Sequence, residues 1–338
     1  MNSQIQEKPR TKQINVSLNV MKCLAIFAVM CGHSTYFLGT GGLVLDGIIR
    51  FTVPFFFLIS GFFSFFTDNT YATEKYKART MKLFKLMIIS NLIFFIYFII
   101  TNRFGDNSFY ILWLLDIHNI FNFLILNVPP TALHLWFIQS LLYCYIIYYF
   151  LSKFQINPNR LYKYIPILFI LCLILGEFFI KAGIKLPIEY YRNFLFMGLP
   201  FFALGYLIHD KEDKIKELVS NRFLICLIVF GCMLAVLEVL TVGVADLFIS
   251  SIMVASGLFI WCIKNPVKLQ RFRISSFIGQ NLYASMYVLH LIIAEMLVAH
   301  GIMGYLNPFI VFILTAIVSY IIYLVLKNIR RIPILNRS

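Results

Sequence analysis

Two basic side chains lie eleven residues apart in the first long apolar segment, which reads KCLAIFAVMCGH from Lys22 to His33. On a helix of about 3.6 residues per turn this is roughly three turns, so both would share one face about 16 Å apart. An imidazole near neutral pH can accept and return a proton, as a general base for a hydroxyl nucleophile does. We take His33 as the leading catalytic candidate, although a histidine that only bonds a neighbouring helix fits the position equally well.

Three cations could bind an anionic or polar substrate. Lys22 lies about one turn into the first apolar segment, where it either snorkels to the inner interface or binds an anion from inside. Arg50 opens the second segment on the outer side, where its guanidinium either snorkels or stabilises a developing oxyanion. Arg79, in KYKARTMKLFK, is either a positive-inside charge or a phosphate contact for a donor such as a coenzyme A thioester.

Polar side chains in later segments are candidates for an acceptor site or a substrate pathway. His134 and Trp136 open the fourth apolar segment on the outer side, where tryptophan is typical of an interfacial belt. Glu177, Glu238 and Glu295 are intramembrane carboxylates. Any of them could orient a histidine, and the sequence does not choose between them.

A polar stripe is predicted on the ninth apolar segment. Tyr283, Tyr287 and His290 fall at i, i+4 and i+7, so on a helix they share one face. Polar groups in a membrane helix face the protein interior rather than lipid. We therefore expect this stripe to point inward, towards the other candidate residues.

The composition sets the class of protein that must position these residues. Hydrophobic residues make up 60% of the 338-residue chain and charged residues 13%, far from the average of a globular protein. Apolar runs long enough to span a bilayer recur, and the alternation of a β-barrel is missing. We predict an all-α, polytopic integral membrane protein. The net charge is +14, and the basic residues are concentrated in short loops between spans. Contact with anionic lipid headgroups explains this position better than binding to nucleic acid does.

About ten membrane-spanning helices are predicted, at residues 16–37, 49–67, 82–101, 134–151, 162–180, 194–209, 221–241, 245–263, 279–300 and 307–327. Most lysines and arginines fall in segments that are cytoplasmic if the N-terminus is inside, so both termini are predicted to be cytoplasmic. The predicted domains are a tail at 1–15, a transmembrane domain at 16–327 and a second tail at 328–338.

Two connections carry further expectations. A glycine-rich turn is predicted between the first two spans, and Pro54 and Gly61 then predict a bent second helix packed closely against the first. The long outer segment 102–133 is predicted to hold an interfacial or re-entrant helix over the outer mouth.

Several motifs of other protein classes are missing. The chain has no G-x-S-x-G elbow, no phosphate-binding glycine loop and no H-E-x-x-H. Its seven cysteines form no C-x-x-C pair, which favours small core residues over a disulfide or metal site. We therefore expect no metal cofactor.

The ordered set of segments resembles the acyltransferase 3 family, polytopic membrane O-acyltransferases that decorate glycans and other hydroxylated substrates. That family's first helix carries Arg or Lys, ten residues and then His, as Lys22 and His33 do. Its second helix has a pattern like R-x-x-V-P-x-F-F-x-x-S-G-F, which reads RFTVPFFFLISGF here from Arg50. A recurring arginine near the start of the third helix matches Arg79. HLWFI, RNFLFMGLPFFALGY and SMYVLH are similar to further landmarks in family order, so the likeness covers 16–327.

Two departures accompany the resemblance. Family members often have Asp-Gly-Leu-Arg-Gly in the first helix, where this chain has Asn19 at the aspartate position, which puts any role of that carboxylate in doubt. Many members also carry a C-terminal SGNH hydrolase-like domain. Residues 1–338 lack one, so we expect the membrane domain or a partner to complete the transfer.

The resemblance implies an O-acyltransferase, with acetyl as the first expectation for the acyl group. Acyl-CoA would dock at the basic inner mouth near Arg79 and Lys22, and His33 would act as the base or carry the acyl group briefly. Arg50 would stabilise the oxyanion or position the substrate, and the acceptor would be a cell-surface glycan or its lipid-linked precursor. The expected location is a bacterial cell membrane, in contact with lipid, and a homo-oligomer is left open. A transporter or flippase is the main alternative, and a sensor or scaffold module is the second.

Overall fold

The computed structural model describes residues 15–33, 39–102, 114–302 and 304–329, which contain helices and connecting segments but no strand. The predicted tails at 1–15 and 328–338, and the end of the predicted first span, fall mainly outside these residues. The α-helices are α1 Val16–Gly32, α2 Gly39–Ile49, α3 Thr52–Phe62, α4 Asn69–Ile100, α6 Ile117–Ile125, α7 Trp136–Lys153, α8 Ile165–Leu173, α9 Phe179–Lys181, α10 Leu199–Asp210, α11 Glu212–Leu218, α12 Asn221–Val242, α13 Ile249–Lys264, α14 Arg273–Asn281, α15 Tyr283–Ala299 and α16 Asn307–Ile329.

Each predicted span overlaps a helix, but the helices differ in length. Within the described ranges, six helical stretches are long and apolar enough to cross a membrane, and a seventh is added if α14 and α15, bent by 85°, form one span. Three shorter apolar helices, at Val16–Gly32, Phe194–Asp210 and Ile249–Lys264, match the remaining predicted spans. The chain is therefore an all-α, multi-pass membrane protein, while the count of ten spans and the orientation stay predictions.

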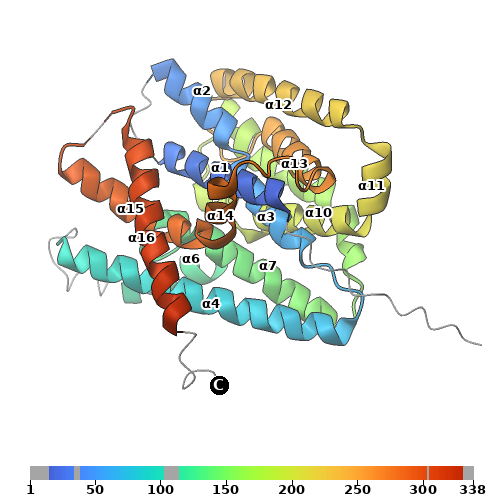
Figure 1. The fold of residues 1–338 in the computed structure, drawn as a ribbon, viewed down its shortest axis with the longest axis horizontal. Helices are drawn as coiled ribbons and strands as arrows, with labels where there is room; N and C mark the ends of the chain where they lie inside the picture. Colours follow the sequence, from blue (N-terminus) through green and yellow to red (C-terminus); the bar gives the residue numbers. More distant parts are fainter. Residues whose placement is uncertain (1–14, 34–38, 103–113, 303, 330–338) are drawn as a thin grey trace, which may run out of the picture.

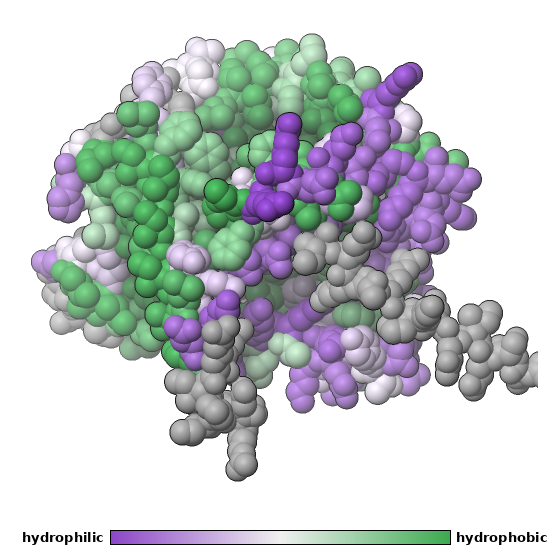
Figure 2. Space-filling view, viewed as in Figure 1, coloured by the Kyte–Doolittle hydropathy of each residue, from purple (hydrophilic) through white to green (hydrophobic). Residues whose placement is uncertain are grey.

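The surface agrees with a membrane setting. Figure 2 shows hydrophobic surface over α12, α15 and α16, and hydrophilic surface gathered around α11 and the first turns of α4. On α16, apolar side chains such as Ile313, Ile317 and Ile321 are each more than half exposed. Water disfavours such a face, whereas lipid tails solvate it.

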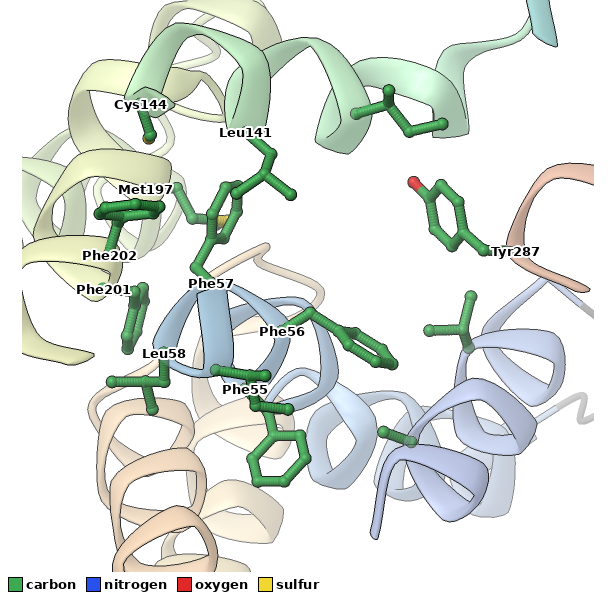
Figure 3. Close-up of a cluster of buried hydrophobic side chains, with 14 of the residues drawn as sticks. Phe55, Phe56, Phe57, Leu58, Leu141, Cys144, Met197, Phe201, Phe202 and Tyr287 are labelled. Carbon is green, nitrogen blue, oxygen red and sulfur yellow. The ribbon is translucent and has the colours of Figure 1, made fainter. Parts of the chain in front are cut away.

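Helix α3 forms the centre of the fold. Its side chains are apolar on every face, and Phe55, Phe57 and Leu58 are completely buried, as expected of a helix that is hydrophobic all round. Figure 3 shows the phenylalanines spreading from α3 towards side chains of α7 (Leu141 and Cys144), of the stretch that leads into α10 (Met197) and of α10 itself (Phe201 and Phe202).

Two glycines bring α3 and α10 into backbone contact. A Cβ atom on Gly61 would lie 1.9 Å from the carbonyl oxygen of Phe202, and one on Gly205 would lie 2.1 Å from that of Leu58. Close packing of α3 was predicted correctly, but its glycine face packs on α10 and not on the first span. Small residues permit this close approach, but the local sequence does not show which helix will pack against them.

The predicted glycine-rich turn before the second span is wrong for residues 39–49, which form α2. The apolar residues after the glycines continue the helical pattern. Gly47 then lets α2 pack closely on α12, because a Cβ there would lie 2.9 Å from the carbonyl oxygen of Ala235. Tertiary contact of this kind overrides the weak helix propensity of glycine.

Helix α6 lies within the predicted outer segment 102–133. Asp116 caps its start by accepting hydrogen bonds from the backbone N–H groups of His118, at 2.9 Å, and Asn119, at 3.3 Å. No residue of α6 is buried. Its end is joined to α7, because the Tyr143 hydroxyl donates to the Leu124 carbonyl at 2.7 Å. An exposed, amphipathic helix of this kind is consistent with the predicted interfacial helix.

Candidate active site

A cavity of about 350 Å³ lies where the end of α1, the junction of α2 and α3, the start of α7 and the middle of α15 meet. Its polar and aromatic lining consists of His33, Asp46, Arg50, Thr52, His134, Trp136, Arg192, Asp246 and Tyr287. A cavity of this kind, lined by charged and aromatic side chains among otherwise apolar helices, is the first candidate for an active site.

His33 is the residue that follows the last turn of α1. Its backbone N–H bonds the carbonyls of Val29 and Met30 at 3.2 Å, and its side chain is exposed to the cavity. The predicted catalytic histidine therefore lies where a substrate in the cavity can reach it.

Arg50 connects two carboxylates across the cavity. Its Nη2 lies 2.5 Å and its Nε 3.2 Å from Oδ2 of Asp46, and its Nη1 donates to Oδ1 of Asp246 at 3.0 Å. These bonds use three of the five N–H donors of the guanidinium. Two N–H donors remain for a ligand oxygen, and the group that carries them is held in place from two sides.

Arg192, which lies between the predicted spans 162–180 and 194–209, is a second cavity cation. Its Nη1 lies 3.7 Å from Oδ1 of Asp246, and its guanidinium carbon lies 5.5 Å from the centre of the Trp136 ring. Asp246 thus pairs with both Arg50 and Arg192. Burial and the nearby carboxylate of Asp246 raise the pKa of Tyr191, so this neighbouring phenol stays neutral at physiological pH.

Two further histidines lie behind His33. The ring centre of His290 is 5.1 Å from that of His33, and that of His134 is 6.0 Å from it. His290 is completely buried and His134 is 5% exposed. The Tyr287 hydroxyl donates to the His134 carbonyl, and its ring points towards the start of α7 (Figure 3). The predicted inward orientation of Tyr287 and His290 on α15 is confirmed.

The predicted donor residues lie outside the main cavity. Lys22 lies in the first half of α1, and its ammonium is 5.3 Å from the centre of the Tyr283 ring. Arg79 donates to the Ser64 hydroxyl at 2.8 Å, and its guanidinium carbon lies 5.7 Å from the centre of the Tyr145 ring. Each of the two cations therefore contacts a tyrosine ring.

A smaller apolar cavity of about 80 Å³ lies beside the main one. Tyr283, which contacts Lys22, and Tyr287, which lines the main cavity, both line it. Phe56 and Phe137 complete its aromatic walls, with ring centres 6.1 Å apart. Aromatic side chains therefore lie between Lys22 and the main cavity.

None of the three intramembrane glutamates lines the main cavity among the described residues. Glu238 is buried and accepts hydrogen bonds from the backbone N–H of Ser250, at 3.2 and 3.4 Å. It therefore caps the start of α13, where its carboxylate accepts hydrogen bonds from backbone N–H groups that have no partner within the helix. Glu295 lies on α15 five residues beyond His290.

The structure brings together His33, Arg50, His134, Trp136, Tyr287 and His290 around the main cavity, Lys22 with Tyr283, and Arg79 with Tyr145. The sequence analysis did not name Asp46, Arg192 or Asp246 as site residues. Asp46 lies four residues before Arg50 on one helical face, a spacing that signals an ion pair. Arg192 opens the segment RNFLFMGLPFFALGY, whose family likeness was the available signal, whereas Asp246 carried no local signal.

The family comparison agrees with this geometry. The acyltransferase 3 family model, described as an acyltransferase domain, matches residues 15–327. The chain belongs to the acyltransferase 3 family. No SGNH hydrolase-like domain is found along it. No curated protein and no solved structure matches the chain. Among the residues described above, no group of three or more His, Cys, Asp or Glu side chains is arranged to hold a metal ion.

Proposed function

We propose that this membrane acyltransferase is an O-acetyltransferase, which moves an acetyl group from cytoplasmic acetyl-CoA to a hydroxyl of a cell-surface glycan or its lipid-linked precursor. One observation carries the proposal. His33 is an accessible imidazole in a cavity that also holds two guanidinium groups, those of Arg50 and Arg192. A base beside fixed cations is what acyl transfer to a hydroxyl requires, because a proton leaves the nucleophile while negative charge develops on the carbonyl oxygen.

The reaction follows from these positions. The His33 imidazole removes the proton of the acceptor hydroxyl, and the oxygen attacks the thioester carbonyl carbon. The tetrahedral oxyanion is stabilised by the N–H donors that Arg50 keeps free of Asp46 and Asp246. The carbon–sulfur bond then breaks, and the thiolate of coenzyme A takes the proton from the His33 imidazolium. The products are an O-acyl ester and the free thiol, and no co-reactant is needed.

The two ends of the molecule suit the two substrates. Lys22 and Arg79 offer cations to the phosphates of the donor at the end that the charge distribution assigns to the cytoplasm. The apolar cavity between Tyr283 and Tyr287 suits the thioester arm. The main cavity, with Trp136 beside Arg192, offers an aromatic face and polar groups to a sugar. On this scheme the protein acts in the plasma membrane.

The experiment is acetyl transfer by the purified protein from radiolabelled acetyl-CoA to a crude glycan extract. Wild-type protein is expected to label glycan, and His33→Ala to lose activity by about 100-fold or more, the contribution of a general base. His118→Ala is the matched control, because His118 is an exposed imidazole on α6, and it is expected to act as wild type.

Other outcomes separate the parts of the proposal. Full transfer by a folded His33→Ala protein would remove the proposed base. Thiol release without labelled glycan would retain the donor and indicate a different acceptor. No thiol release from folded wild-type protein would reject acetyl-CoA as the donor.

A further inference from the structure

Two buried imidazoles beside His33 have hydrogen-bonding capacity that the protein itself does not use. Nδ1 of His290 lies 2.8 Å from the Tyr287 carbonyl oxygen. A carbonyl only accepts, so Nδ1 carries the hydrogen and Nε2 presents a lone pair. Nε2 of His290 is buried and has no hydrogen-bond partner in the described structure. An unsatisfied buried acceptor costs free energy, so a donor is expected beside it.

His134 repeats the arrangement less strongly. Its Nε2 lies 3.4 Å from the Val288 carbonyl oxygen, and its buried Nδ1 has no partner among the described residues. A contact of 3.4 Å fixes a tautomer more weakly than one of 2.8 Å. His290 is also nearer to His33, with ring centres 5.1 Å apart against 6.0 Å for His134. Of the two, His290 is therefore the better defined acceptor.

The distance between His33 and His290 suits a direct bond between their rings. An N–H···N bond of about 2.9 Å, plus the distance from nitrogen to ring centre on both sides, places two imidazole centres about 5 Å apart. The observed separation is 5.1 Å, with the planes tilted by 48°. A modest rotation of the exposed His33 side chain therefore brings one of its N–H groups onto Nε2 of His290.

The carboxylates of the cavity are engaged elsewhere, because Asp46 and Asp246 both bond Arg50. Glu238, outside the cavity, bonds the start of α13. A catalytic histidine needs a group that holds one ring N–H, so that the other nitrogen faces the substrate with its lone pair. A neutral imidazole provides that acceptor without an additional buried charge, which would be costly at this depth.

We propose that His290 is the positioning residue for His33: its Nε2 accepts the N–H of one His33 ring nitrogen and leaves the other as the base that faces the cavity. The inference rests on the proposed acyl transfer and specifies how its base is oriented. When His33 gains the proton of the acceptor hydroxyl, the bond to His290 becomes charge-assisted and stronger. His290 itself neither gains nor loses a proton.

Two substitutions separate an acceptor at Nε2 from a merely structural histidine. In His290→Asn the side-chain amide sits near the position of Nδ1 and can still donate to the Tyr287 carbonyl, but nothing replaces Nε2. In His290→Gln the longer side chain can place its oxygen near the position of Nε2. With acetyl-CoA and glycan extract, we expect His290→Asn to lower kcat about 100-fold with KM for acetyl-CoA unchanged, and His290→Gln to restore kcat to within about tenfold of wild type.

The matched control lies on the same helix. His300 is exposed at the end of α15, and its Nδ1 lies 2.7 Å from the Met296 carbonyl oxygen. It therefore shares the backbone bond of His290 but has no role near His33. Both His300→Asn and His300→Gln are expected to keep the wild-type kcat.

The outcomes are distinct from those of the proposed function. If wild-type protein transfers acetyl and depends on His33, but His290→Asn keeps full kcat or His290→Gln restores nothing, the positioning role is rejected and acyl transfer is retained. A measurement on wild-type protein tests the inference even where the variants do not fold. In wild-type protein with 15N-labelled histidine, a proton-mediated 15N–15N correlation between His33 and His290 is expected, and its absence from folded protein would also overturn the inference.

Discussion

Each cation of the cavity depends on a carboxylate that lies far from it in the chain. Asp246 pairs with Arg50 at 3.0 Å and with Arg192 at 3.7 Å, and its side chain is only 10% exposed. A largely buried carboxylate between two guanidinium groups fixes both and reduces their mutual repulsion. The geometry of the proposed oxyanion site therefore depends on Asp246 as much as on the arginines.

Asp246→Asn is expected to lower kcat for acetyl transfer by about 10- to 100-fold, because Arg50 and Arg192 lose the charge that holds them. The amide keeps the size of the side chain, so we expect the fold to persist. Steady-state kinetics with acetyl-CoA and glycan extract check this, with Glu217→Gln, an exposed carboxylate on α11, as the control. An unchanged kcat would show that the arginines are positioned without Asp246.

The site also shows which residues sequence reasoning can find. His33 and Arg50 were predicted because ionisable side chains in apolar helices are rare and costly. Arg192 lies between two predicted spans, and its local sequence does not show that the chain places it beside Trp136. Asp246 is 196 residues from Arg50, and such a long-range pair leaves no pattern in a single sequence.

At the scale of the helices, glycines fix the distances that the site requires. Helix α3 begins just after Arg50. Its C-terminal half is packed backbone to backbone on α10 through Gly61 of α3 and Gly205 of α10. The existence of these helices was predictable from apolar runs of the right length. The packing partner of each helix was not predictable, because small residues allow a close approach without specifying which helix approaches. The segment that forms α2 was predicted as a turn for a related reason, since the close packing of Gly47 on α12 is not visible in the sequence.

Gly205→Ala is expected to destabilise the protein by about 3 kcal/mol or more, because the new methyl group would lie 2.1 Å from the Leu58 carbonyl oxygen and the backbone must move. Thermal unfolding in detergent measures the effect. Gly41→Ala on α2 is the control, because no atom lies within 4 Å of its added Cβ. It is expected to leave stability unchanged or raise it by up to about 1 kcal/mol. Equal melting temperatures for Gly205→Ala and wild type would contradict the close contact.

Across the whole molecule, the predicted donor and catalytic residues lie apart. Lys22 lies in the first half of α1 and His33 directly after its end, and the charge distribution predicts that the start of α1 faces the cytoplasm. Acyl-CoA is made in the cytoplasm, whereas a surface glycan is available outside. This arrangement predicts that the inner residues affect the use of the donor and that the outer residues affect the chemical step.

Arg79→Met tests that division. A charge-assisted bond to a phosphate contributes about 1.5 to 3 kcal/mol, so KM for acetyl-CoA is expected to rise by about 10- to 100-fold while kcat changes less than threefold. Lys77→Met is the matched control, because Lys77 is an exposed cation two residues away, whereas Arg79 turns inward to the Ser64 hydroxyl and Tyr145 ring. If KM is unchanged in Arg79→Met, the donor phosphates bind elsewhere. If kcat falls instead, Arg79 contributes to the chemical step, and the separation of donor binding from chemistry along α1 is wrong.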